Sequence, residues 1–200
     1  MKNFFIYWIY FIRYYVDIVI DINMSETNDE YKIAKARMFA LMTHHKVGQK
    51  YDGKYPYYYH LKMVSDFAIM FSYLLKPEER TDAIIIALFH DLVEDCRLTY
   101  NDVKNVWGET IADGVYACTE LRGKNRKERH GPEYTRGLQE SFLGTYNKLC
   151  DITANMTMGQ RTGSKMFPMY QKEYPHTRKN LYREDFKEIF EYMETNLINC

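Results

Sequence analysis

An apolar run that ends at Phe89 leads directly into four polar residues that a hydrophobic core cannot accommodate by itself. They are His90, Asp91, Glu94 and Asp95. In a helix, residues four apart share a face, so Glu94 falls beside His90 and the two aspartates fall beside each other. An imidazole and three carboxyls next to a core are costly unless a positive charge lies among them. A divalent metal ion is the simplest candidate, and it needs further ligands from elsewhere in the chain.

Apolar residues recur at helical spacing along most of the sequence, and no segment shows the sustained alternation of a strand. Pro77 suits the first turn of a helix, and Thr99 suits a helix cap. We predict helices over 31–47, 60–75, from 77 to the His-Asp cluster, a short segment ending at 107, 110–120, 133–142, 145–155 and 178–197. Because His90 and Asp91 are adjacent, they can share one ion only near a turn or helix end. Irregular segments are expected at 49–59, 121–132 and 156–175. The predicted fold class is all-α, with one helical domain in a chain of 200 residues.

The composition limits the kinds of partner and compartment that we expect for this chain. The formal net charge is zero, which argues against a nucleic-acid partner bound through a broad basic surface. Hydrophobic residues make up 46% of the chain, enough for a substantial core. The four cysteines are scattered and form no Cys-x-x-Cys pair, so we expect reduced thiols and a cytoplasmic protein.

The segment 4–22 is apolar and aromatic, but Arg13, Asp17 and Asp21 interrupt it. A membrane-spanning helix needs about 20 mostly apolar residues, and a signal peptide needs a basic start and a small-residue cleavage site. Three alternatives stay open: an additional packed helix, a membrane-contacting segment, or an extension ahead of a natural start at Met24. We favour the first and third, and divide the chain into an extension at 1–23 and a domain at 24–200.

Two other places offer ligands for the predicted metal ion. His60 follows three tyrosines at the start of a predicted helix, and Asp151 and Asn155 lie one turn apart on another. A set of two histidines and two aspartates suits Mn²⁺ and also admits Fe²⁺, Zn²⁺ or Mg²⁺, whereas a structural zinc site would use cysteine. Open positions on the ion would hold water and a phosphate oxygen, with Glu94 and Asp95 as candidate bases. The chemistry indicated is metal-assisted hydrolysis of a phosphoester or phosphoanhydride.

Three segments in order resemble the HD hydrolase domain of the RelA/SpoT enzymes and of the small stand-alone (p)ppGpp hydrolases. They are Tyr-Tyr-Tyr-His at 57–60, Ala-Leu-Phe-His-Asp-Leu-Val-Glu-Asp at 87–95, and Lys-Leu-Cys-Asp-x-x-x-Asn-Met at 148–156. Segments 45–49 and 98–108 are also similar, so the resemblance covers about 33–155.

The resemblance implies an HD-domain helical bundle with a metal site between helices. It also implies a Mn²⁺ ion held by His60, His90, Asp91 and Asp151, with Glu94 and Asp95 activating water and Asn155 contacting substrate. The implied reaction removes pyrophosphate from the 3′ position of guanosine tetra- or pentaphosphate.

The chain departs from the family where the nucleotide is recognised. The family carries an arginine, or Arg-Lys, that packs on guanine, and this chain has Lys50-Tyr51. The candidate substrate-binding residues are Lys50, Tyr51, Asn155, Lys148 and Arg126. Two alternatives follow: an HD-type phosphohydrolase for another nucleotide (a dNTP, NADPH or a nucleoside monophosphate), or a metal- or nucleotide-binding module without turnover. The sequence leaves the oligomeric state open.

Overall fold

Helix α2 (Asp29–Val47) begins the part of the chain that the structure, a computed structural model, describes: residues 29–199. The other α-helices are α3 (Tyr58–Met70), α4 (Pro77–Phe89), α5 (Leu92–Asp95), α6 (Tyr100–Trp107), α7 (Glu109–Cys118), α8 (Arg126–Arg129), α9 (Pro132–Glu140), α10 (Phe142–Thr162), α11 (Phe167–Leu181) and α12 (Lys187–Met193). Short 3₁₀ turns lie at Ser72–Leu74 and Glu184–Phe186, and a π turn lies at Glu194–Ile198. The prediction of an all-α fold is confirmed.

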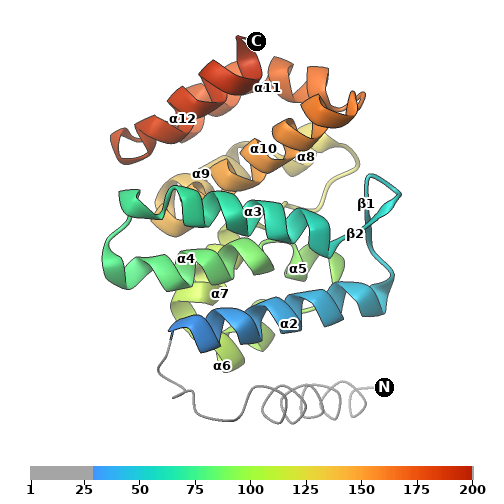
Figure 1. The fold of residues 1–200 in the computed structure, drawn as a ribbon, viewed down its shortest axis with the longest axis vertical. Coiled ribbons are helices and arrows are strands. Elements are labelled where there is room, and N and C mark those ends of the chain that lie inside the picture. Colours follow the sequence, from blue (N-terminus) through green and yellow to red (C-terminus); the bar gives the residue numbers. More distant parts are fainter. Residues whose placement is uncertain (1–28, 200) are drawn as a thin grey trace.

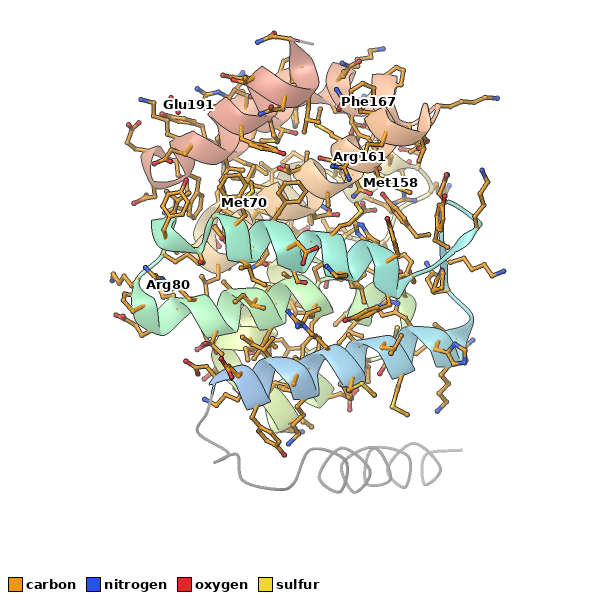
Figure 2. All side chains as sticks on the ribbon, in the orientation of Figure 1. Met70, Arg80, Met158, Arg161, Phe167 and Glu191 are labelled. Atoms are coloured by element: carbon orange, nitrogen blue, oxygen red, sulfur yellow. The ribbon has the colours of Figure 1, made fainter. Side chains whose placement is uncertain are left out.

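The helices stack in layers across the molecule. Figure 1 shows α2, α4, α3 and α10 following one another, with α11 and α12 beyond α10. Helix α7 packs against α4 and α10, which places α3, α4, α7 and α10 around the centre. Side chains fill the spaces between the ribbons (Figure 2). The metal-site candidates lie on three of these central helices or at their ends.

The segment 49–59, predicted to be irregular, contains a short antiparallel hairpin. Strands β1 (Lys50–Tyr51) and β2 (Tyr55–Pro56) pair with Tyr51 opposite Tyr55. The turn between them holds Asp52 and Gly53 at φ 51° and 67°, and the Lys54 N–H donates to the Tyr51 carbonyl at 3.1 Å. Asp-Gly in this left-handed conformation matches the twist of a hairpin. The Asp-Gly pair was therefore a signal for this turn.

The predictions for the C-terminal part are wrong in two places. Segment 156–175 was predicted to be irregular, but α10 continues beyond its predicted end and α11 includes Pro175. The helix predicted at 178–197 is divided, because α11 ends at Leu181 before α12 begins. Tyr174 and Leu181 are two turns apart and both buried. Their packing offsets the backbone hydrogen bond that Pro175 cannot make.

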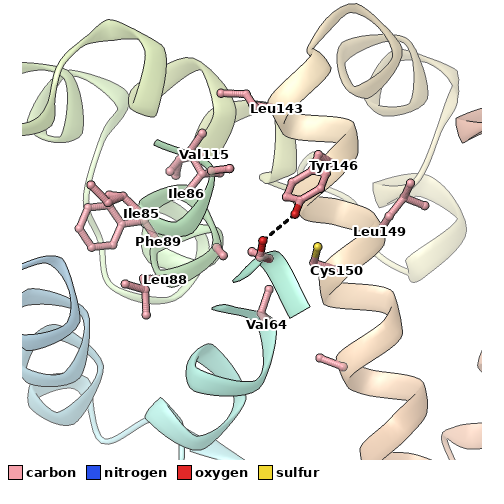
Figure 3. Packing of buried hydrophobic residues seen from close by; sticks show 14 of the residues in the cluster. Val64, Ile85, Ile86, Leu88, Phe89, Val115, Leu143, Tyr146, Leu149 and Cys150 are labelled. Atoms are coloured by element: carbon pink, nitrogen blue, oxygen red, sulfur yellow. Dashed lines mark hydrogen bonds between the residues drawn. The ribbon is translucent and has the colours of Figure 1, made fainter. Parts of the chain in front are cut away.

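Apolar side chains of α3, α4, α7 and α10 form the core (Figure 3). Members of it with no exposed surface include Val64, Ile86, Val115 and Leu149. Tyr146 is also fully buried, and its hydroxyl donates to the Ala68 carbonyl at 2.6 Å (Figure 3). Ala68 lies in the last turn of α3, where carbonyls lack partners within the helix. Tyr146, on α10, thus supplies a hydrogen-bond donor for a carbonyl in the last turn of α3.

Replacing Tyr146 by phenylalanine is expected to lower the free energy of unfolding by about 1–2 kcal/mol. The ring stays in place, but the Ala68 carbonyl is left buried without its partner. Urea unfolding followed by circular dichroism measures the change. Tyr116→Phe is the control, since Tyr116 is 60% exposed and should change stability by no more than about 0.5 kcal/mol. Equal losses in both variants would contradict the capping role.

Within residues 29–199, no helix has both the length and the apolar character that crossing a membrane requires. The predictions made for the segment 1–23 concern residues outside those that the structure describes.

Candidate metal centre

A break in the chain between α4 and α5 turns two adjacent side chains toward the same point. Helix α4 ends at Phe89 and α5 begins at Leu92, so the helix predicted from Pro77 ends at the His-Asp pair, as two adjacent ligands of one ion require. His90 is the C-cap of α4 and Asp91 the N-cap of α5. Within one helix, neighbouring residues diverge by about 100°. The interruption lets both side chains face His60 in the first turn of α3.

Four donor atoms from three parts of the chain share one small space. His60 Nε2 lies 3.2 Å from His90 Nε2, and Asp91 Oδ2 lies 2.8 Å from the latter. Asp151 Oδ1, on α10, is 3.2 Å from His60 Nε2 and 3.7 Å from His90 Nε2. An ion with ligands at about 2.1 Å places neighbouring donors roughly 3 Å apart. His60, His90 and Asp91 therefore have the mutual spacing of metal ligands. Asp151 Oδ1, close to both imidazoles, adds a second carboxylate oxygen, and this donor set suits a divalent cation.

Hydrogen bonds from neighbouring groups orient the donor side chains toward the centre of the site. His90 Nδ1 lies 2.9 Å from the Ala87 carbonyl, which assigns a proton to Nδ1 and directs Nε2 at the centre, where a cation would replace the second ring proton. The Tyr57 hydroxyl donates to Asp91 Oδ2. Lys148 Nζ lies 2.9 Å from Asp151 Oδ2. These bonds hold the side chains in place before any ligand is bound.

The charges of the cluster favour a cation at its centre. Burial alone would lower the pKa of His90, but Asp91 and Asp151 raise it to about 9. Burial alone would raise the pKa of Asp91, yet His90 holds it well below its ordinary value. Lys148 and His60 do the same for Asp151. Both carboxylates are thus ionised at neutral pH and stabilise positive charge between them.

Glu94 and Asp95 lie one turn further along and line the same cavity. The backbone N–H of Glu120 donates to Glu94 Oε1, and Gln49 Nε2 donates to Asp95 Oδ2 at 3.0 Å. Burial, and then the charge of Asp91, raises the pKa of Glu94 to about 7 and that of Asp95 to about 6. Carboxyl groups with pKa values near neutrality are suited to accept and release protons during a reaction.

The cavity has a volume of about 1220 Å³, and its lining includes His60, Asp91 and Asp151. The lining also includes Tyr51, Tyr170, Arg97, Arg122 and Arg126. Typical small-molecule pockets measure roughly 300–1,000 Å³. The space is therefore sufficient for a nucleotide with more than one phosphate group.

Known proteins resemble this chain in sequence over a short stretch. No family model matches it. The bifunctional (p)ppGpp synthase/hydrolase SpoT of Escherichia coli K12 is 28% identical over 85 residues, which are 39% of this chain but 12% of that protein. The same values hold for the guanosine-3′,5′-bis(diphosphate) 3′-pyrophosphohydrolases of Escherichia coli O157:H7 and Shigella flexneri. The match thus spans a small part of each curated relative.

The structural similarity extends over nearly the whole domain. A solved structure described as a metazoan ortholog of SpoT that hydrolyzes ppGpp superposes with a TM-score of 0.66. The superposition covers 87% of this chain and 97% of that one, at 19% identity. This chain therefore shares the fold of that protein. The prediction of an HD-domain bundle is thereby confirmed at the level of the fold.

Four of the five predicted substrate-binding residues line the HD-domain cavity. They are Tyr51, Asn155, Lys148 and Arg126. Lys50 is exposed on β1 and is not among the residues that line it. Arg126 is already paired, because its Nε and Nη2 lie 2.9 Å and 3.1 Å from the two carboxylate oxygens of Glu173. Its guanidinium also lies over the Tyr170 ring at 5.8 Å.

Tyr57 and Tyr170 are among the tyrosines of the cavity that were not predicted as site residues. Tyr57 contacts Asp91 from one turn before His60, a position that helical spacing could have indicated. Tyr170 lies in the segment that was predicted to be irregular, so its side chain could not be placed. Both have raised pKa values, chiefly because they are buried, and that of Tyr170 reaches about 12. They therefore stay protonated and can donate hydrogen bonds.

Proposed function

We propose that this protein is a Mn²⁺-dependent pyrophosphohydrolase. Its substrate would be an alarmone of the guanosine 3′,5′-bis(diphosphate) type, from which it releases the 3′-pyrophosphate. The convergence of His60, His90, Asp91 and Asp151, with Glu94 beside them, is the observation that carries the proposal. The similar proteins are named for (p)ppGpp hydrolysis, and this supports the choice of substrate.

Each residue of the site has a definite task in this proposal. The two histidines and two aspartates would hold the ion, which supplies a Lewis acid that acidifies water and polarises a phosphate oxygen. Glu94 would accept the proton of the attacking water, since the Glu120 N–H orients its carboxylate. Lys148 lies in the cavity beside Asp151 and would stabilise negative charge on the substrate phosphates.

The compartment and the domain follow from the same proposal. We place the working enzyme in the cytoplasm, where nucleotides are available and where the free thiols of Cys96, Cys118 and Cys150 stay reduced. Residues 24–200 would constitute the HD domain, acting on a small-molecule substrate without a nucleic-acid partner.

The decisive measurement is the set of products formed with added Mn²⁺. Guanosine tetraphosphate is expected to yield GDP and pyrophosphate in a one-to-one ratio, because water attacks the phosphorus attached to the 3′ oxygen. Ion-exchange chromatography resolves the nucleotide, and a coupled assay quantifies pyrophosphate. Protein that is inert on this substrate but cleaves another nucleotide would refute the alarmone assignment, and protein that binds nucleotides without any product would refute the enzyme.

A phosphohydrolase for another nucleotide is the second candidate, and one observation favours it. Tyr51 lies in the cavity wall at the place where the family resemblance has a guanine-packing arginine, and Lys50 lies outside the cavity. A panel containing a dNTP, NADPH and a nucleoside monophosphate, read for phosphate against pyrophosphate, separates the two candidates.

A further inference from the structure

The two histidines of the candidate metal centre are held in different ways. His90 Nδ1 is 2.9 Å from the Ala87 carbonyl. His60 Nδ1 is buried and has no hydrogen-bond partner among residues 29–199. A metal-binding imidazole almost always donates its second N–H to a protein group, which fixes the orientation of the ring. Another contact must therefore orient His60.

The ring of Tyr51 supplies that contact. Its centroid lies 4.7 Å from that of His60, with an angle of 16° between the planes, so the two rings are stacked. Tyr57 meets His60 edge-on, at 5.5 Å and 66°. Aromatic pairs in these two geometries attract each other beyond their buried area. The stack on one face and the edge contact together restrict rotation of the His60 ring.

Tyr51 is itself held at both ends. The turn at Asp52 and Gly53 fixes the backbone of β1. At the other end, the Tyr51 hydroxyl donates to Asn155 Oδ1 at 3.0 Å, and Asn155 Nδ2 donates to Asp151 Oδ1 at 2.6 Å. The hairpin is thereby connected through one side chain to two of the four donors, His60 by stacking and Asp151 by hydrogen bonds.

We propose that Tyr51 is a positioning residue for the metal centre. Its ring holds His60 in the orientation that directs Nε2 at the other donors, in place of the hydrogen bond that His60 Nδ1 lacks. The inference rests on the proposed metal centre and adds to it a role for the hairpin. One ring face of Tyr51 is occupied by His60, so a nucleobase can stack only on the other face.

The affinity for Mn²⁺, measured by isothermal titration calorimetry without substrate, tests this role. Tyr51→Leu is expected to weaken Mn²⁺ binding by about 10- to 100-fold, the usual effect of removing a group that orients a ligand. Tyr51→Phe keeps the stacked ring and should stay within about threefold of wild type. Tyr59→Leu is the matched control, because Tyr59 is 48% exposed and stacks on Tyr55.

A spectroscopic measurement separates positioning from a general loss of structure. With Zn²⁺ bound, the ring ¹H and ¹⁵N resonances of His60 should shift or broaden in Tyr51→Leu and stay close to wild type in the phenylalanine variant. Tyr51→Met, which keeps bulk without an aromatic face, replaces the leucine variant if that protein does not fold.

Three results would overturn the inference, and they have distinct meanings. Unchanged Mn²⁺ affinity and unchanged His60 resonances in Tyr51→Leu would exclude a positioning role for Tyr51 while leaving the proposed function intact. A loss in Tyr51→Phe as large as that in Tyr51→Leu would assign the effect to the hydroxyl and exclude stacking. Failure of the wild-type protein to bind Mn²⁺ would refute the metal centre, and with it the positioning role of Tyr51.

Discussion

Asp91→Asn is expected to reduce kcat/KM for the nucleotide substrate by on the order of 10³-fold or more, because several kcal/mol of transition-state stabilisation depend on the metal ion. Asparagine has almost the same size but no charge, and Asp91 Oδ2 lies between the two imidazoles and the Tyr57 hydroxyl. The same variant should lose most of its affinity for Mn²⁺. Initial rates and calorimetric titration measure the two effects.

Asp66→Asn is the control for the loss of a carboxylate. Asp66 lies on the surface of α3 and forms an ion pair with Lys62 one turn away, and surface pairs of this kind contribute little. It should therefore retain wild-type rates and Mn²⁺ affinity. If Asp91→Asn behaves like this control, the cluster at α3, α4 and α10 is not the metal centre.

The second large effect is expected for Glu94→Gln. Removing a positioned base typically costs about 10²- to 10⁴-fold in kcat. Glutamine can still accept the Glu120 N–H at its carbonyl oxygen, so the local structure is preserved. Mn²⁺ affinity should stay near that of wild type, because Glu94 is not one of the four converging donors. Turnover lost together with the metal would contradict the assignment of Glu94 as the base.

The pH dependence of the wild-type rate gives an independent measure of the same group. Burial and the charge of Asp91 raise the pKa of Glu94 from 4.5 to about 7. A base acts as the carboxylate, so kcat falls as the pH drops through this pKa. Water screens the partly exposed side chain and a bound cation favours its ionised form, so the midpoint should lie between about 4.5 and about 7. The limb due to Glu94 should be absent from Glu94→Gln.

Local sequence was sufficient to predict most of the helices that carry the site. The helical spacing of apolar residues predicted α2, α3, α4, α7 and much of α10, because each of these helices buries one face or more in the core. Pro77 and Thr99 correctly predicted the starts of α4 and α6. The hairpin and α11 were missed, since a two-residue strand shows no alternation and prolines argue against a helix.

The residue types, their order and the family resemblance together predicted which four residues donate to the ion. They did not predict the distances between the donor atoms. Adjacent residues in a helix point about 100° apart, so two adjacent ligands required a turn or helix end, and the structure has that break between Phe89 and Leu92. The predicted role of Arg126 depended on its charge alone. Its pairing with Glu173 arises from α11, a helix that the prediction left out.

The sequence by itself determined the residue types of the centre and the helices that carry them, because periodic burial and metal-ligand chemistry are both readable from local order. Tertiary structure alone decided how the donors meet. Segments up to 91 positions apart, from His60 to Asp151, come together only when α3, α4 and α10 pack. It also decided which tyrosine lies against His60, because that contact depends on the turn of the hairpin and on the hydrogen bond that Tyr51 donates to Asn155 of α10.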